Sequence, residues 1–296
     1  FRLYNPISFK YLTLILLYPT TIFIKRIIDT STMKDKISIT LNKKTLQEID
    51  ALIDNVYIRN RSHAIEHLVE SSLGQNKVAV ILAGGDAEQQ LIGKNEYRPI
   101  TKINNISIVE KAVKKLRNSG FKMIYIIAQD IILTKIFEIL KDGTSYGIKI
   151  GYMEERHSKG SAYSLKLLKA KIKSKFLVVY SDIIFDKINL DELWNDHIKQ
   201  NFIATLMLTT SPSPSEKGTV KVEGSKILEF TQKPAKSDVY LVFSPIFVAD
   251  PEIFEYDGNS LEYDIFPELA QKALLQGHIS SEKEIHIHSI EDKKKV

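Results

Sequence analysis

The chain has 296 residues and a net charge of +5, and its length predicts about two domains. It contains no cysteine, which excludes disulfides, thiolate nucleophiles and cysteine-bound metals and favours a reducing compartment, so we expect a cytoplasmic protein. Hydrophobic residues make up 44% and charged residues 26% of the chain. These values are typical of globular proteins and exclude disordered or fibrous chains.

Residues 1–32 form a leader that we expect to lie outside the native protein. Its apolar stretch, residues 11–24, ends at two basic residues and is shorter than the roughly 20 residues that a membrane span needs. No small-residue cleavage site of a signal peptide follows it. The first methionine is Met33, and our hypothesis is that the native protein starts there. The alternative is an amphipathic membrane anchor.

Residues 33–74 predict a small module of one strand and two helices. Residues 37–41 alternate between apolar and polar side chains, as in a strand with one buried face. Asn42 is a suitable N-cap for a helix over residues 43–55, and Ser62 for a second helix. Because so short a unit cannot bury its apolar stripes alone, we expect a homodimer or higher homo-oligomer.

This module resembles the ribbon-helix-helix family of DNA-binding domains over residues 34–73. The resemblance implies that two copies pair their strands into a ribbon that enters the major groove of double-stranded DNA. It also implies that the N-terminus of the second helix holds a DNA phosphate. The DNA-binding residues implied in this way are Lys36, Ser38, Thr40, Lys43, Arg61 and Ser62. The alternative is a module that only dimerises.

Residues 75–292 alternate between strands and helices and predict an α/β domain. We expect apolar strands at residues 78–82, 123–127, 148–152 and 176–180, and helices at residues 108–116, 132–140 and 161–168. Such alternation gives a mostly parallel, Rossmann-like sheet that binds ligands at the carboxyl ends of its strands. The later part is mixed, with helices at residues 190–201 and 261–275 and strands at residues 204–208, 218–223, 227–230 and 239–248.

Several motifs follow one another along this domain. A buried strand runs into Gly84 and Gly85, where a phosphate can approach the backbone. The later motifs are RPI from Arg98, KGSA from Lys159, Asp182 after an apolar strand, GTV from Gly218, FTQKP from Phe230 and LEYDIFP from Leu261. The whole series is similar to the sugar-1-phosphate nucleotidyltransferases. The similarity covers residues 77 to about 280, and the shared order of the motifs is more specific than any one of them.

The resemblance implies the transfer of a nucleotidyl group from a nucleoside triphosphate to a sugar 1-phosphate, with release of pyrophosphate. Such a reaction needs positioning and charge neutralisation but no covalent nucleophile. The implied cofactor is Mg²⁺, held by Asp182 and Asp264. The implied nucleotide-binding residues are Ala83, Gly84, Gly85, Gly160, Ser161 and Ala162. The implied catalytic residues are Arg98 and Lys233, and the implied sugar-binding residues are Gly218 and Gln232.

The phosphate loop departs from the family's pattern. The family's loop reads LAGGxGTRL, whereas this chain has Ala87, Glu88 and Gln89 in place of glycine, threonine and arginine. A carboxylate is thus added, and a cation lost, where the triphosphate is expected. The sequence therefore favours a DNA-binding transcriptional regulator whose nucleotidyltransferase-like domain binds a nucleotide or nucleotide-sugar without turnover. The alternative is an active nucleotidyltransferase.

Overall fold

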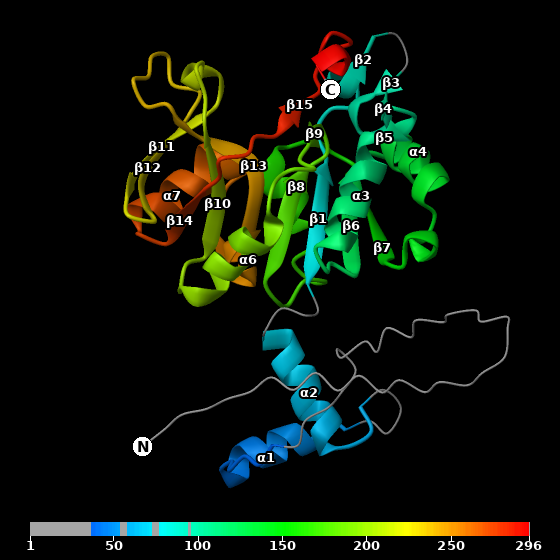
Figure 1. Cartoon of the computed structure of the whole chain (residues 1–296), viewed down its shortest axis with the longest axis vertical. Coiled ribbons are helices and arrows are strands. Elements are labelled where there is room, and N and C mark those ends of the chain that lie inside the picture. The colour runs from blue at the N-terminus through cyan, green and yellow to red at the C-terminus, as the bar shows by residue number, and fades with distance from the viewer. Residues whose placement is uncertain (1–36, 54–57, 73–76, 94–95, 296) are drawn as a thin grey trace, which may run out of the picture. The chain divides into compact units, whose positions relative to one another are not determined.

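The computed structural model describes residues 37–53, 58–72, 77–93 and 96–295 (Figure 1). The leader, residues 1–32, and Lys36 lie outside these ranges, so the predictions made for them stay predictions. None of the helices found within these ranges combines the length and the apolar composition of a membrane span.

The first N-terminal helix, α1 (Lys43–Asp50), begins where the sequence predicts it. Asn42 is its cap, because Asn42 Oδ1 accepts the Thr45 N–H at 2.8 Å. The helix ends earlier than predicted, at a turn. The prediction of a strand at residues 37–41 is wrong for the single chain, in which these residues have no regular secondary structure. A lone segment has no neighbouring strand with which to form a ladder.

The second N-terminal helix is α2 (Arg61–Ser72). The prediction that Ser62 caps it is wrong, because Asn60 Oδ1 accepts the His63 N–H at 2.9 Å and so makes Asn60 the cap. Serine and asparagine are about equally favourable caps, so their identity alone could not distinguish two positions this close together.

The large domain is built on one nine-stranded mixed sheet with the strand order β10-β14-β12-β11-β13-β8-β1-β6-β7 (Figure 1). Its parallel part consists of β8 (Phe176–Tyr180), β1 (Val78–Ala83), β6 (Met123–Ala128) and β7 (Lys149–Glu154). The mixed part consists of β10 (Ala204–Thr210), β11 (Gly218–Glu223), β12 (Lys226–Gln232), β13 (Leu241–Ala249) and β14 (Leu275–Ile279). This architecture confirms the predicted α/β domain with a mixed later part.

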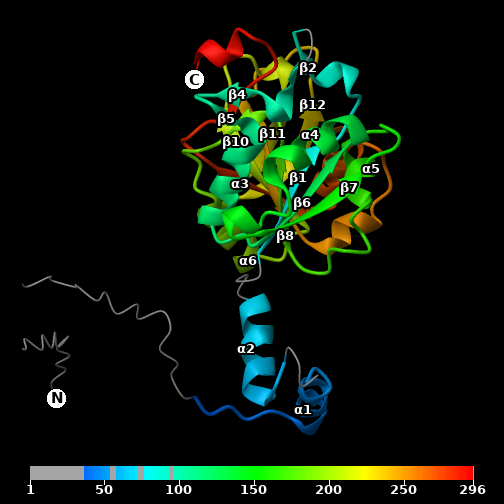
Figure 2. The same ribbon diagram turned by 90° about the vertical axis from the view of Figure 1, so that its right-hand side faces the viewer.

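Helices cover both faces of the sheet (Figures 1 and 2). Along β1 the side chains of Ala79 and Ile81 join one apolar core, and those of Val80 and Leu82 join another. The first core includes residues of α3 (Ile108–Asn118), α4 (Asp130–Leu140) and α6 (Leu190–Lys199). The second core includes residues of α5 (Ser161–Lys166) and α7 (Phe266–Gln271). The sheet is therefore buried on both sides, as its continuous apolar strands require.

The prediction of one helix over residues 261–275 is wrong for its last four residues. A π-helical turn (Leu261–Ile265) leads into α7, which ends at Gln271. Ala273 then adopts a left-handed conformation with a φ of 57°, which ends the helix. The chain continues as β14, parallel to β10. A short apolar run is compatible with either a helix or a buried strand, so its sequence pattern does not decide between them.

Three pairs of short strands complete the domain. They are β2 (Leu91–Ile92) with β3 (Glu96–Tyr97), β4 (Lys102–Ile103) with β5 (Ile106–Ser107), and β9 (Ile183–Ile184) with β15 (Ile285–His286). The last pair has a functional consequence. Because β9 follows β8 by only a few residues, it brings the C-terminal segment, defined here as residues 284–292, to the end of β8.

A buried polar network joins α6 to the sheet. His197 is fully buried, and its Nδ1 lies 2.8 Å from Thr205 Oγ1. Its Nε2 lies 3.6 Å from Asp250 Oδ2, and Asp250 also accepts a hydrogen bond from Lys175 Nζ at 2.5 Å. Burial, together with repulsion from Lys175, lowers the pKa of His197 to about 4 despite the attraction of Asp250.

This network predicts a loss of stability in mild acid. The unfolded chain binds a proton at this histidine near pH 6.5 but the native chain only near pH 4, so the free energy of unfolding falls as pH drops through that window, by up to about 3 kcal/mol. Urea unfolding at pH 7.5 and pH 4.5 should show a smaller pH dependence for His197→Gln than for the unmodified chain. An equal pH dependence in both proteins would contradict this assignment.

Candidate functional site

The carboxyl ends of the parallel strands meet at one edge of the sheet. The strand register aligns Ala83 of β1 with Ala128 of β6, and Ala128 with Glu154 of β7. On the other side of β1, Leu82 is aligned with Tyr180 of β8. The residues that follow these strands are Gly84, Gln129, Glu155 and Ser181. The phosphate-loop glycines and Asp182 therefore come from neighbouring positions on one edge, where such sheets bind ligands.

The loop after β1 is held by two buried side chains. Gln90 Nε2 donates to the carbonyl oxygens of Ala83 at 2.9 Å and Gly84 at 2.8 Å. The Glu155 carboxylate accepts the Gly85 N–H at 2.7 Å. A Cβ on Gly84 would lie 2.6 Å from Glu155 Oε2. The sequence predicts that a phosphate approaches the backbone at Gly85, but the Gly85 N–H already donates a hydrogen bond to the carboxylate of Glu155.

The other predicted nucleotide-binding segment starts α5. Ser164 donates its hydroxyl to the same Glu155 carboxylate, which links α5 to the phosphate loop. The N–H of Ala162 donates to the Asn259 carbonyl oxygen at 2.8 Å. Gly160 has a φ of 121°, and a Cβ there would lie 2.5 Å from that carbonyl oxygen. This segment therefore needs glycine for its conformation and for its close contact with the loop around Asn259.

This contact predicts a large loss of stability on substitution. Gly160→Ala should lower the free energy of unfolding by about 2–4 kcal/mol, because the methyl group adds a backbone clash to a strained φ. Gly224→Ala is the matched control, since Gly224 has a φ of 60° but no atom within 4 Å of the added Cβ. Urea unfolding of both variants measures the difference. Equal destabilisation would show that the contact with Asn259 is unimportant.

Glu262 connects the α5 segment to the end of β8. Its Oε2 accepts the Ser161 hydroxyl at 2.6 Å, and Tyr180 donates its hydroxyl to Oε1. Burial, followed by the charge of Glu262, raises the pKa of Tyr180 well above its usual range. Asp264, in contrast, uses its Oδ2 to accept the N–H groups of two neighbouring loop residues at 2.8 and 2.9 Å. Glu262 is a site residue that sequence reasoning missed.

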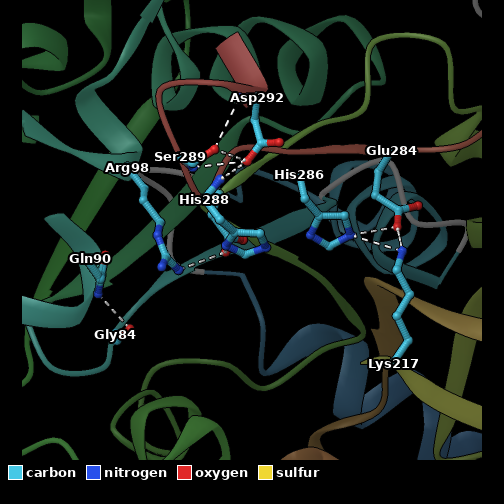
Figure 3. Close-up of polar contacts among 10 residues, drawn as sticks. Gly84, Gln90, Arg98, Lys217, Glu284, His286, His288, Ser289 and Asp292 are labelled. Atoms are coloured by element: carbon cyan, nitrogen blue, oxygen red, sulfur yellow. Dashed lines mark hydrogen bonds and ion pairs between the residues drawn. The ribbon is translucent and has the colours of Figure 1, made fainter. Parts of the chain in front are cut away.

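Two of the predicted residues, Arg98 and Asp182, lie close together. Arg98 Nη1 lies 3.6 Å from Asp182 Oδ2, and His288 Nδ1 lies 3.6 Å from the same oxygen. The Asp182 carbonyl oxygen accepts the Ile287 N–H at 2.9 Å. Figure 3 shows Arg98 and His288 pointing toward one another. The Nε of Arg98 is buried and has no hydrogen-bond partner within the part of the chain that the structure describes.

The C-terminal segment contributes further polar side chains (Figure 3). The rings of His286 and His288 stack with their centroids 5.3 Å apart and an interplanar angle of 19°. The Glu284 side chain is 1% exposed, and its Oε1 accepts the Lys217 Nζ at 2.8 Å. The same oxygen lies 2.9 Å from His286 Nε2. The sequence signal was the alternation IHIH at residues 285–288, which places both histidines on one face of a strand.

Burial and neighbouring charges together shift the pKa values of two groups in this segment. Burial alone would raise the pKa of the Glu284 carboxyl, but hydrogen bonding to His286 and the charge of Lys217 lower it to about 2. Burial lowers the pKa of His288, and the attraction of Asp182 opposes this effect. Glu284 is therefore an anion across the physiological pH range and stabilises positive charge on its neighbours.

The predicted sugar-binding residues lie together on β11 and β12. The strand register pairs Gly218 with Gln232, and a Cβ on Gly218 would lie 2.7 Å from Gln232 Oε1. This Oε1 is buried and has no hydrogen-bond partner among the described residues. The Lys233 N–H donates to the Lys217 carbonyl oxygen at 2.9 Å, and the Lys233 side chain is exposed.

The carboxylates fit Mg²⁺ only in part. Within the described ranges, no three His, Asp or Glu side chains form a group that could hold a metal ion. Mg²⁺ bound to nucleotides needs only one or two protein carboxylates, because phosphate oxygens and water complete its coordination. Asp182 fits this role at the strand edge. Asp264 fits it less well, because its Oδ2 already accepts two backbone N–H groups.

The predicted DNA-binding residues are exposed where the structure describes them. Ser38, Thr40, Lys43 and Ser62 are all exposed. Arg61 is exposed as well, but its guanidinium forms a two-point ion pair with Asp50, at 2.6 and 2.8 Å. A DNA phosphate would therefore compete with Asp50 for this side chain.

Comparison with known proteins identifies the family of the large domain. The chain matches the family model described as "Nucleotidyl transferase" over residues 78–285. It belongs to the nucleotidyl transferase family. It is 26% identical over 219 residues to the UTP–glucose-1-phosphate uridylyltransferase of Synechocystis sp., with 67% of this chain and 56% of the relative covered. It is 27% identical over 179 residues to the bifunctional protein GlmU of Methanococcus aeolicus, with 60% and 41% covered.

A solved structure shares the fold of this nucleotidyl transferase family member. A Bacillus anthracis protein described as a glucose-1-phosphate thymidylyltransferase superposes with a TM-score of 0.68 at 19% sequence identity. The match covers 74% of this chain and 92% of that protein. The chain spans about half the length of the curated relatives that it matches. The family match confirms the resemblance to nucleotidyltransferases that the ordered motifs suggest.

Proposed function

We propose that the large domain is a Mg²⁺-dependent enzyme that transfers a nucleotidyl group from a nucleoside triphosphate to a sugar 1-phosphate and releases pyrophosphate. The observation that carries this proposal is the meeting of Arg98 with Asp182. They come from separate motifs of the chain, and Asp182 follows the strand next to the one that leads into the phosphate loop. A cation beside a carboxylate at this edge suits a metal-bound polyphosphate.

The residues predicted for the large domain, apart from Asp264, have the following roles in this proposal. Asp182 would hold Mg²⁺, which neutralises phosphate charge when bound, and Arg98 would stabilise the charge that develops on the phosphates. The acceptor's sugar would contact Gly218 and Gln232, and its phosphate would contact Lys233. The nucleotide would lie along Ala83, Gly84, Gly85, Gly160, Ser161 and Ala162.

The amino-acid sequence favours a DNA-binding regulator, whereas membership of the nucleotidyl transferase family favours this enzyme. The curated relatives include proteins named for nucleotidyl transfer to a sugar phosphate, such as the Synechocystis uridylyltransferase. In the structure, Glu88 and Gln89 are both exposed on the loop, so their side chains are not required by the core. The unusual loop therefore affects the rate rather than the fold.

A pyrophosphate-release assay tests the proposed reaction. The full chain is incubated with each common nucleoside triphosphate, Mg²⁺ and a panel of sugar 1-phosphates. We expect release that requires both substrates and stops when EDTA removes Mg²⁺. A protein that binds a nucleotide without any turnover, and whose DNA affinity changes when it does so, would favour the regulator instead.

We also propose that residues 33–74 form a ribbon-helix-helix homodimer that binds double-stranded DNA. The support is an uncovered apolar row: Ile37, Ile39 and Leu41 are 80%, 51% and 38% exposed in the single chain. Their alternation places them on one face of a strand, and a paired strand from a second copy would form the missing ladder and bury this face.

This second proposal predicts an oligomer and two kinds of DNA contact. Light scattering should show at least a dimer at micromolar concentration, and a monomer would contradict the assignment. Lys43→Ala should weaken binding to all DNA sequences alike and reduce the salt dependence, because a phosphate contact carries no sequence information. Ser38→Ala should cost about 1–3 kcal/mol only on the preferred site selected from random DNA.

A further inference from the structure

The C-terminal segment lies across the candidate site as a row of alternating charges (Figure 3). One end of the row is the Arg98–Asp182 pair, in which Asp182 Oδ2 also lies 3.6 Å from His288. The other end is the Lys217–Glu284 pair, whose carboxylate lies 2.9 Å from His286. The stacked imidazoles join the two pairs. Asp292 adds a further carboxylate beside His288, because its Oδ2 accepts the N–H groups of His288 and Ser289 at 3.1 and 3.0 Å.

Each imidazole keeps one ring nitrogen that has no hydrogen-bond partner among the described residues. The contacts of His286 involve its Nε2, and those of His288 involve its Nδ1. Within the described part of the chain, no hydrogen bond is formed by His286 Nδ1 or His288 Nε2. An imidazole has two ring nitrogens, so each ring can contact a protein group with one nitrogen and a ligand with the other.

The segment is joined to the residues proposed to bind the acceptor. Lys217 directly precedes Gly218, and its carbonyl oxygen accepts the Lys233 N–H at 2.9 Å. Its Nζ lies 3.2 Å from His286 Nε2. The buried Glu284 carboxylate also keeps an oxygen, Oε2, without a hydrogen-bond partner in the described residues. The histidine pair thus lies between Asp182 and the proposed acceptor side.

We propose that the stacked His286 and His288 bind the phosphate group of the acceptor, and that Glu284 is a positioning residue that holds His286 in place. This inference rests on the proposed function for the identity of the acceptor. The phosphate would lie between the guanidinium of Arg98 and the ammonium of Lys217, where charge-assisted hydrogen bonds are strongest. The carboxylate of Glu284 would fix the orientation of the His286 ring.

A triphosphate and a sugar phosphate both carry phosphate groups that the histidines could bind. The position of His286 and His288 favours the sugar phosphate, which is the acceptor. The phosphate-loop glycines, which would meet a triphosphate, are bonded to Gln90 and Glu155 rather than to the C-terminal segment. The histidines contact instead the residue that precedes Gly218 and supports Lys233. We therefore assign the histidine pair to the acceptor phosphate.

Calorimetric binding to the full chain tests this inference without turnover. The probes are inorganic phosphate, glucose 1-phosphate and mannose 1-phosphate, and in a separate arm each nucleoside triphosphate with Mg²⁺. His286→Ala and His288→Ala should each weaken the binding of the phosphate and sugar-phosphate probes at least tenfold and change nucleoside triphosphate binding less than twofold. Glu284→Gln, which keeps a hydrogen-bond acceptor beside His286, should weaken binding less than Glu284→Ala does.

His63→Ala is the matched control, because it removes an exposed imidazole outside the large domain, and the thermal unfolding midpoint of each variant reports on its fold. Unchanged affinity of both histidine variants for all phosphate probes, or no binding of any probe by the unmodified chain, would overturn the inference. A loss confined to the triphosphate would also overturn it, because the site would then belong to the donor. If the unmodified chain binds a sugar phosphate through these histidines but releases no pyrophosphate with any substrate pair, the inference stands and the proposed reaction fails.

Discussion

Replacing Asp182 by asparagine is expected to lower the rate of pyrophosphate release by about a hundredfold or more. The asparagine side chain has nearly the same shape, but it lacks the charge with which a carboxylate binds Mg²⁺. It also removes the ion pair with Arg98, whose Nη1 lies 3.6 Å from Asp182 Oδ2. The rate is measured over a range of Mg²⁺ concentrations, and the variant should need more Mg²⁺ to reach half of its own maximum.

Asp186→Asn is the matched control for this prediction. Asp186 lies just beyond β9, and its side chain is 53% exposed, with Oδ2 3.6 Å from Lys111 Nζ. The same change of charge there should leave the rate of pyrophosphate release within twofold of the original. If Asp182→Asn keeps the full rate and the same dependence on Mg²⁺, then Asp182 does not hold the metal ion and the proposed site is wrong.

The parallel half of the sheet was predictable from the sequence because its strands are buried on both faces. Such strands are continuous apolar runs between turns, as in VAVILA of β1 and FLVVY of β8. The observed bounds of these strands differ from the predicted ones by at most two residues at either end. Their parallel order places all carboxyl ends at one edge, so the region of the site was predictable as well.

The contacts within the site were less predictable, because they join residues far apart in the chain. Glu155 has no motif of its own, yet its carboxylate holds both Gly85 and Ser164. The same holds for Glu284 with Lys217, and for His288 with Asp182. The Glu284 and His288 contacts depend on the pairing of β15 with β9. A two-residue strand gives too short a pattern to identify its partner from the sequence.

In the N-terminal module, a local contact was predictable from the sequence, but a contact that needs a second chain was not. Its first helix and the Asn42 cap were predictable, because capping is a local interaction between residues three apart. The strand at residues 37–41 was a prediction about two chains, and a single chain cannot form it. Alternation predicts which side chains share a face, but only a partner can supply the hydrogen bonds.

Restoring the family's phosphate loop with the triple variant Ala87→Gly, Glu88→Thr and Gln89→Arg is expected to raise pyrophosphate release by about tenfold to a hundredfold. Two unit charges about 4 Å apart interact by roughly 4 kcal/mol at an effective dielectric constant of 20. Removing an anion and adding a cation beside the triphosphate therefore stabilises the charge that develops in the transition state.

The structure explains why this loop should tolerate the change. The Glu88 and Gln89 side chains are exposed, while the loop is fixed by Gln90, whose Nε2 donates to the carbonyl oxygens of Ala83 and Gly84. The substitutions leave these hydrogen bonds in place, so the loop should keep its conformation.

Glu138→Arg on the exposed face of α4 is the control for this loop variant, because it makes the same change of net charge away from the loop. It should leave the rate of pyrophosphate release within twofold of the original. Adding Asp182→Asn to the loop variant should remove the gain, since the new arginine acts on a triphosphate that the metal ion must still hold. A loop variant no faster than the original would show that Glu88 and Gln89 do not limit the reaction. Another feature of the site would then limit the rate. The next contact to remove would be the hydrogen bond from the Gly85 N–H to Glu155, because it occupies a backbone donor of the phosphate loop.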